Sequence, residues 1–161
     1  MIFLHGYVFD SNTFINLFRH YYESRFPTLW ANFHDLITEG RLISVREVKI
    51  ELQTYYRTDR LTKWIQENDE IFKQPDDSES KFIKDIFEIE RFRRIIERKK
   101  ILSGKPVADP FLIAKAKILG ISVVTEEKYK KNGVKIPNIC EYFDIPCTNL
   151  EGFMENENWQ F

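Results

Sequence analysis

The sequence of 161 residues has few cysteines and no excess of one charge. Its two cysteines, Cys140 and Cys147, form no CxxC pair and have no histidine near them, so the pattern indicates neither a zinc site nor a disulfide framework. The 24 lysines and arginines balance 25 aspartates and glutamates, which excludes a general attraction of the whole chain to nucleic acid. Any polyanionic partner must therefore be bound by a local basic patch.

Long apolar runs are also missing. No segment approaches the roughly 20 apolar residues that a membrane-spanning helix needs, and the opening "MIFLHG" lacks the features of a secretory signal. We therefore expect no membrane contact and a cytoplasmic location. The hydrophobic content of 43% suffices for one core in a chain of this length. We expect a single domain over residues 1–161, with its core in residues 7–150 and an acidic, aromatic tail at 151–161.

Short apolar segments alternate with amphipathic ones along the chain. Residues 7–10, 41–44 and 121–125 have the composition of buried strands. Helical spacing of apolar residues predicts helices over 11–22, 27–39, 45–56, 81–100 and 109–119. The polar stretch "QPDDSES" predicts an exposed loop, and "SGKP" predicts a break at 103–106. No two strands are joined by a hairpin-length turn, so we expect an α/β fold with a mostly parallel sheet covered by helices.

Local signals predict how several helices begin and end. Ser11 is available as the N-cap of the first helix. Asp109 is a candidate N-cap of the last predicted helix, with Pro110 at its first helical position. Gly40 and Gly120 stand directly after helical segments and predict their ends.

Acidic residues follow the predicted strands. Because open parallel sheets bind ligands beyond the carboxyl ends of their strands, acidic residues at those ends are candidate site residues. Glu47 and Glu51 are one helical turn apart, so both can face the same side. Four segments thus direct carboxylates at one crevice, and their acidic residues are Asp10, Glu47, Glu51, Asp109, Glu126 and Glu127.

Clustered carboxylates favour a bound divalent cation, because each negative charge raises the pKa of its neighbours. All-oxygen ligation suits Mg²⁺ or Mn²⁺ better than Zn²⁺. Such a metal can activate water and neutralise charge on a phosphodiester during in-line attack. The pattern therefore predicts metal-assisted phosphodiester hydrolysis.

Four segments, in this order, resemble the signature segments of PIN-domain ribonucleases: "VFDSN", "VREVKIEL", "ADPFLIAKA" and "VVTEE". The resemblance spans residues 7–150. It implies a three-layer α/β/α sandwich and a Mg²⁺- or Mn²⁺-dependent endoribonuclease. It also implies that the protein is the toxin of a toxin–antitoxin pair, with RNA as substrate, a cognate antitoxin protein as partner and a homodimer as a possible assembly.

The same resemblance implies residue roles. Asp10, Glu51 and Asp109 would ligate the metal, and Glu127 would be the fourth catalytic acid, standing where many members have Asp. Glu47 is an alternative to Glu51, and Glu126 is an alternative to Glu127. Asn12 and Thr125 would hold ligands or waters in place without touching the metal.

Basic residues near the predicted crevice are candidates for contact with RNA phosphates. They are Arg41, Arg46 and Lys49 beside the acidic helix, and Lys128 after the last acidic pair. A further basic run is "RFRRIIERKK".

Other interpretations remain open at this point. Asp10 and Asp109 could simply cap helices, and the glutamates could be solvated surface or turn residues. A PIN-like domain that no longer cuts could bind RNA or protein. "FDSNT" also partly matches the Asp-any-Asp-any-Thr loop of haloacid-dehalogenase-like phosphatases, but Asn12 stands where that loop needs an acid–base Asp.

Overall fold

The computed structural model describes residues 5–104 and 107–161, so the predicted break at 103–106 lies partly outside the described residues. The strands are β1 (Tyr7–Phe9), β2 (Leu42–Val45), β3 (Phe72–Lys73), β4 (Ser122–Val124) and β5 (Cys147–Thr148). The α-helices are α1 (Ser11–His20), α2 (Pro27–Thr38), α3 (Arg46–Tyr55), α4 (Asp59–Glu67), α5 (Asp77–Glu88), α6 (Glu90–Ser103), α7 (Asp109–Leu119), α8 (Ile136–Tyr142) and α9 (Leu150–Asn156). A short 3₁₀ helix, η1, covers Asp69–Ile71.

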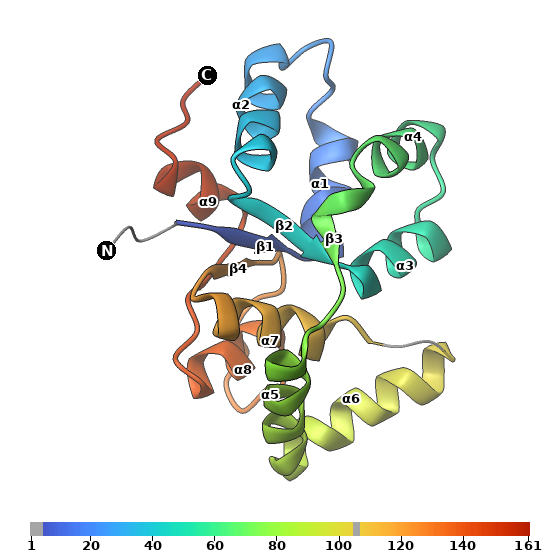
Figure 1. Cartoon of the computed structure of the whole chain (residues 1–161), viewed down its shortest axis with the longest axis vertical. Helices are drawn as coiled ribbons and strands as arrows, with labels where there is room; N and C mark the ends of the chain where they lie inside the picture. Colours follow the sequence, from blue (N-terminus) through green and yellow to red (C-terminus); the bar gives the residue numbers. More distant parts are fainter. Residues whose placement is uncertain (1–4, 105–106) are drawn as a thin grey trace.

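The five strands form a parallel sheet in the order β3-β2-β1-β4-β5, which confirms the predicted α/β class. Helices α1, α2 and α4 cover one face of the sheet, and α5, α7 and α8 cover the other (Figure 1). The fold is therefore a three-layer α/β/α sandwich. Helices α3 and α6 lie toward the edge at which the central strands end. None of the helices in the described ranges is both long and apolar enough to cross a bilayer.

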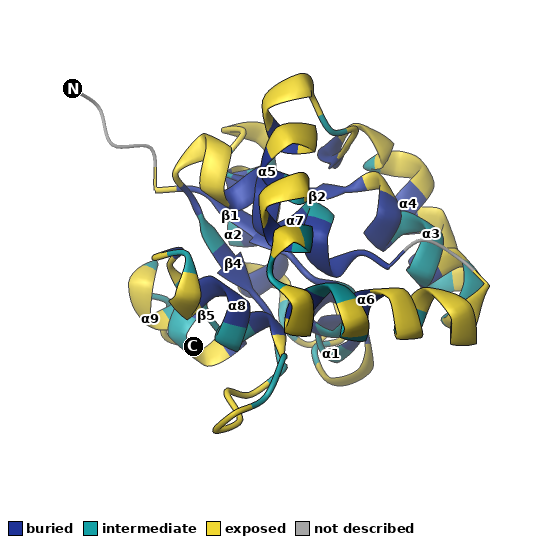
Figure 2. Cartoon of the chain, turned by 90° about the horizontal axis from the view of Figure 1, so that it is seen from below, coloured by how far each residue is buried: buried dark blue, intermediate teal, exposed yellow. Residues whose placement is uncertain are grey.

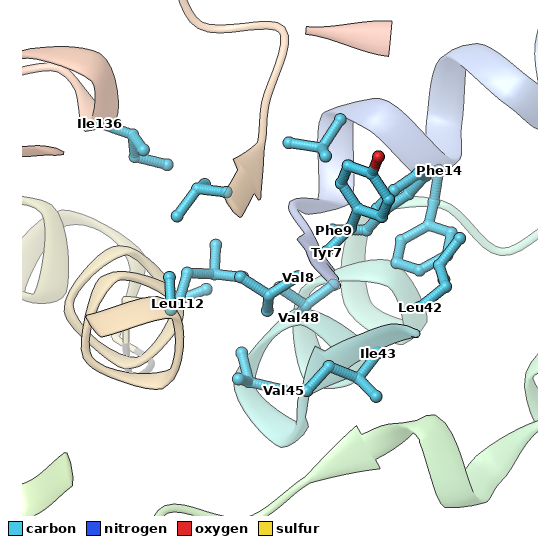
Figure 3. Close-up of a cluster of buried hydrophobic side chains, with 14 of the residues drawn as sticks. Tyr7, Val8, Phe9, Phe14, Leu42, Ile43, Val45, Val48, Leu112 and Ile136 are labelled. Atoms are coloured by element: carbon cyan, nitrogen blue, oxygen red, sulfur yellow. The ribbon is translucent and has the colours of Figure 1, made fainter. Parts of the chain in front are cut away.

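The alternating side chains of β1 connect the two halves of the core. The ring of Phe9 lies 5.5 Å from that of Phe14 on α1 and 5.8 Å from that of Phe33 on α2. Val8 points to the opposite face, toward Leu112 of α7 (Figure 3). This alternation is the period of two that a strand imposes on a sheet buried on both faces. Figure 2 shows the consequence, with buried strands inside and helices exposed only on their outer sides.

Two predictions about the middle of the chain are wrong. The helix predicted over 81–100 is two helices, because the chain turns at Ile89, whose extended backbone ends α5 and begins α6. The predicted loop "QPDDSES" instead contains the start of α5. Asp76 and Glu79 form a reciprocal capping box there, each side chain accepting the other's backbone N–H.

The C-terminal segment is part of the core, so the core extends past the predicted limit at residue 150. Asn149 caps α9 by accepting the backbone N–H of Gly152 at 2.9 Å. Phe153 is fully buried, with its ring 4.7 Å from that of Tyr7. Glu157 accepts a hydrogen bond from the Tyr7 hydroxyl at 2.6 Å. The tail therefore covers the sheet near the start of β1.

A buried ion pair joins α5 to α7. The Lys115 ammonium lies 2.7 Å from the Glu79 carboxylate, and these residues are only 5% and 2% exposed. Lys115 also donates to the Gln74 carbonyl at 3.0 Å. A buried charge is tolerated when it is paired and hydrogen-bonded in this way.

We expect Lys115→Met to lower the free energy of unfolding by about 3 kcal/mol, because it leaves the Glu79 carboxylate buried without its counter-ion. This loss lies at the low end of the range for breaking a buried ion pair, because Glu79 keeps its hydrogen bond from the Asp76 N–H. Urea unfolding measures the loss, with Lys81→Met on the exposed side of α5 as the control. A loss no larger than that of the control would show that the pair contributes nothing.

Candidate active site

An open cavity of about 490 Å³ lies at the carboxyl-terminal edge of the sheet. From β1 the chain adds β2 and then β3 on one side of the sheet, and it later adds β4 and β5 on the other side of β1. The direction in which strands are added therefore reverses at β1. Such a reversal point is where open α/β sheets bind ligands. The four acidic residues that line this cavity come from four separate segments: Asp10, Glu51, Asp109 and Glu127.

Asp10 is the most buried of the four, at 4% exposure. It is the N-cap of α1, in place of the predicted Ser11, because its Oδ1 accepts the Ser11 backbone N–H at 2.7 Å. Its Oδ2 accepts the Thr125 hydroxyl at 2.8 Å. Burial and the negative charge of Asp109 raise the pKa of the Asp10 carboxyl to about 8, with smaller contributions from Glu127 and Glu51. The Asp10 side chain therefore caps α1 and also lines the acidic cavity.

Glu51 is held in the cavity by two donors from distant parts of the chain. Its Oε2 accepts the Ser11 hydroxyl at 2.8 Å, and its Oε1 accepts the Ala108 backbone N–H at 3.2 Å. Burial raises the pKa of the Glu51 carboxyl, although these two hydrogen bonds oppose the shift. Ser11 therefore links Asp10 to Glu51.

Asp109 is the first residue of α7, with Pro110 next, whereas Ala108 occupies the N-cap. The predicted capping role of Asp109 is therefore wrong, and the side chain is directed to another partner. Its Oδ2 accepts a hydrogen bond of 2.8 Å from the ammonium of Lys99, which lies on α6. Burial lowers the pKa of Lys99, but the carboxylates of Asp109, Glu127 and Asp10 together outweigh this effect, and the net pKa is raised.

Glu127 both lines the cavity and holds the next helix. Its Oε2 accepts the Ile136 backbone N–H, the first of α8, at 2.8 Å. Asn12 also lines the cavity, and its side-chain oxygen accepts the Glu126 N–H at 3.0 Å. The Thr125 hydroxyl donates to Asp10, so Asn12 and Thr125 each contact an acidic segment, and their supporting role stays a prediction.

The two alternative acids lie outside the cavity lining. Glu47 is 1% exposed, and its Oε1 pairs with Arg46 at 2.8 Å. Its Oε2 has no hydrogen-bond partner within residues 5–104 and 107–161. Glu126 is turned to the C-terminal segment, where its Oε1 accepts the Leu150 N–H at 2.8 Å. Of the two glutamates of α3, only Glu51 therefore lines the cavity.

The basic residues predicted for RNA contact are placed differently from expectation. Arg41 precedes β2, at the opposite edge of the sheet, where its guanidinium binds Glu157 at 2.7 Å. Arg46 is paired with Glu47, and Lys49 is paired with Asp69 at 2.6 Å. Lys128 is exposed just after Glu127. The prediction that Arg41 lies near the crevice is wrong.

Two cavity residues were not predicted to act there. Ser11 was assigned to helix capping, and Lys99 was only one member of a basic run. The sequence offers a weak signal for Lys99, since it stands ten residues before Asp109. That separation indicates contact only once the path of the chain between α6 and α7 is known.

The donor set of the cavity suits a hard dication. It consists of oxygen ligands. Burial and the repulsion from neighbouring carboxylates raise the Asp10 pKa, and a nearby double positive charge would offset that repulsion. No group of three His, Cys, Asp or Glu side chains in the described part of the chain is arranged to hold a metal ion. In this structure Glu51 and Asp109 direct oxygens to protein donors. Asp10, Glu51 and Asp109 are the residues that could hold the cation, with Glu127 beside them.

Comparison with known proteins gives a family and no activity. No curated protein and no solved structure matches the sequence significantly. One protein family matches residues 7–161, and its description is "Domain of unknown function (DUF4411)". The match runs from the start of β1 to the last residue, so it includes every acidic residue of the cavity. The chain therefore belongs to the DUF4411 family.

Proposed function

We propose that this protein is a metal-dependent endoribonuclease that hydrolyses RNA phosphodiester bonds. The observation that carries the proposal is the convergence of Asp10, Glu51, Asp109 and Glu127 on one cavity at the reversal point of the sheet. Helix capping accounts for part of the roles of Asp10 and Glu127. It does not account for Glu51 and Asp109, which are directed into the same cavity without capping their own helices.

The chain's own residues would position the reaction. When bound, Mg²⁺ or Mn²⁺ supplies a more acidic water and neutralises charge on the phosphate. The Thr125 hydroxyl and the Ser11 N–H fix both oxygens of Asp10, and the Ser11 hydroxyl fixes Glu51. The carboxylates are thus oriented before any substrate arrives, which limits the reorganisation that the reaction needs.

The biological part of the proposal depends on the resemblance to PIN-domain ribonucleases. The four segments that carry the resemblance supply the four acidic residues of the cavity. By that resemblance we infer the toxin of a toxin–antitoxin pair, silenced by a cognate antitoxin, with homodimer formation as a further expectation. The chemistry and the biological role can fail separately.

We expect the purified protein to cleave single-stranded RNA in the presence of Mn²⁺ or Mg²⁺. Excess EDTA should abolish cleavage, and added Mn²⁺ should restore it, because the carboxylates alone do not supply a Lewis acid. Gel analysis of end-labelled RNA measures the internal cuts. Equal cleavage with and without the chelator would contradict the proposal.

A second candidate function is a binding module that no longer cuts. The ion pair between Lys99 and Asp109 favours it, because a built-in ammonium already occupies one of the acidic ligands. In that case RNA would be retained by the protein in a filter assay but left intact at every Mn²⁺ concentration. The cleavage assay therefore separates the two functions.

A further inference from the structure

Helix α6 places one charged side chain in the acidic cavity while much of the helix lies outside the core. Phe92 and Ile96 are buried and anchor its first half. Ile101 and Leu102, in the second half, are 80% and 79% exposed. Figure 1 shows α6 extending away from α5 toward the edge where α3 lies. Lys99 belongs to this second half and lines the cavity.

Within residues 5–104 and 107–161, the Lys99 ammonium forms an ion pair with Asp109, one of the four cavity acids. It lies 2.8 Å from Asp109 Oδ2, a distance typical of a charge-assisted hydrogen bond. The Asp109 side chain is 11% exposed and that of Lys99 is 36% exposed, so solvent screens the pair only in part. The charge of Lys99 also acts on Asp10 and Glu127. One ammonium thus offsets part of the repulsion among four carboxyl groups.

The same Asp109 oxygen cannot serve the ammonium and a divalent cation equally well. Like charges repel, so a dication bound to Asp109 would weaken the hold of Lys99, and Lys99 would weaken the hold of the dication. We propose that Lys99 is a built-in counter-ion of the site, which competes with the divalent metal for Asp109 and leaves it when the metal binds. This regulation of the site rests on the proposed metal-dependent function.

The test is the binding of Mn²⁺ by isothermal titration calorimetry without RNA, so that it does not depend on catalysis. We expect Lys99→Met to lower the Kd for Mn²⁺ roughly tenfold or more, because the competing charge is removed while the apolar stem is kept. Lys99→Arg keeps the charge and should stay within about threefold of wild type. The control is Lys100→Met, which removes an equal charge from an exposed neighbour and should leave the Kd unchanged.

The outcomes separate this inference from the proposed function. Equal Mn²⁺ affinity in the wild type and in Lys99→Met would overturn the counter-ion role and leave the nuclease proposal intact. Binding by Lys99→Met alone would support the counter-ion role and favour the non-cutting module. If neither the wild type nor Lys99→Met binds Mn²⁺, and Mn²⁺ leaves the thermal unfolding of each protein unchanged, the counter-ion role and the nuclease proposal are both overturned. An equal gain in Lys100→Met would assign the effect to overall charge and overturn the inference.

Discussion

Asp10→Asn should lower the rate of metal-dependent RNA cleavage by roughly 10³-fold or more. A weakly held metal would stabilise the transition state less, and a loss of several kcal/mol in that stabilisation corresponds to this factor. The substitution removes the charge and preserves the size of the most buried acid in the cavity. The amide oxygen can still accept the Ser11 N–H and so keep the cap of α1. The loss should therefore appear in activity and not in folding.

Cleavage rates of labelled RNA in Mn²⁺ measure this effect. Asp35→Asn, on the exposed side of α2, is the matched control and should retain wild-type activity. If the protein acts as a toxin, induced expression should arrest growth, and Asp10→Asn should relieve the arrest. Undiminished cleavage by a folded Asp10→Asn protein would remove the nuclease proposal.

The stability of the metal-free protein should depend on pH through Asp10. Because the folded-state pKa of about 8 lies above the unfolded value, the folded protein binds this proton more tightly than the unfolded chain does. The contribution of Asp10 to the free energy of unfolding is therefore largest below the unfolded pKa and falls as the pH rises through 8. At about 1.4 kcal/mol per pH unit, the fall between pH 5 and pH 8 is on the order of 4 kcal/mol.

Urea unfolding in EDTA isolates this contribution when wild type and Asp10→Asn are compared at each pH. The variant should gain stability relative to wild type as the pH rises, because its amide does not ionise. A difference that stays constant from pH 5 to pH 8 would contradict the assigned pKa. Saturating Mn²⁺ should shrink the difference, since bound metal stabilises the folded wild type.

The sequence predicted the fold class and the location of the site well, for a physical reason. Strand and helix periods are local, and the carboxyl ends of parallel strands share one edge, so Asp10, Glu51, Asp109 and Glu127 could be assigned to one crevice. The failures concern properties that depend on distant contacts. Periodicity continues through Ile89, although the backbone turns there.

The direction in which individual side chains point could not be predicted from the sequence either. Glu47 and Glu51 share a helix, but one is buried against Arg46 and the other faces the cavity. Arg41 is near the acidic helix along the chain, yet a parallel strand carries it to the far edge of the sheet. Lys99 reaches Asp109 only because α6 and α7 bring the two residues together.

The Glu127 side chain reaches from the cavity to the start of α8, a span that suits the length of a glutamate. Its side chain spans from the cavity wall to the amide that opens α8. An aspartate is one methylene shorter and would have to give up one of these ends. Shortening the side chain at position 127 would therefore need a compensating change at the start of α8, and the two positions should vary together.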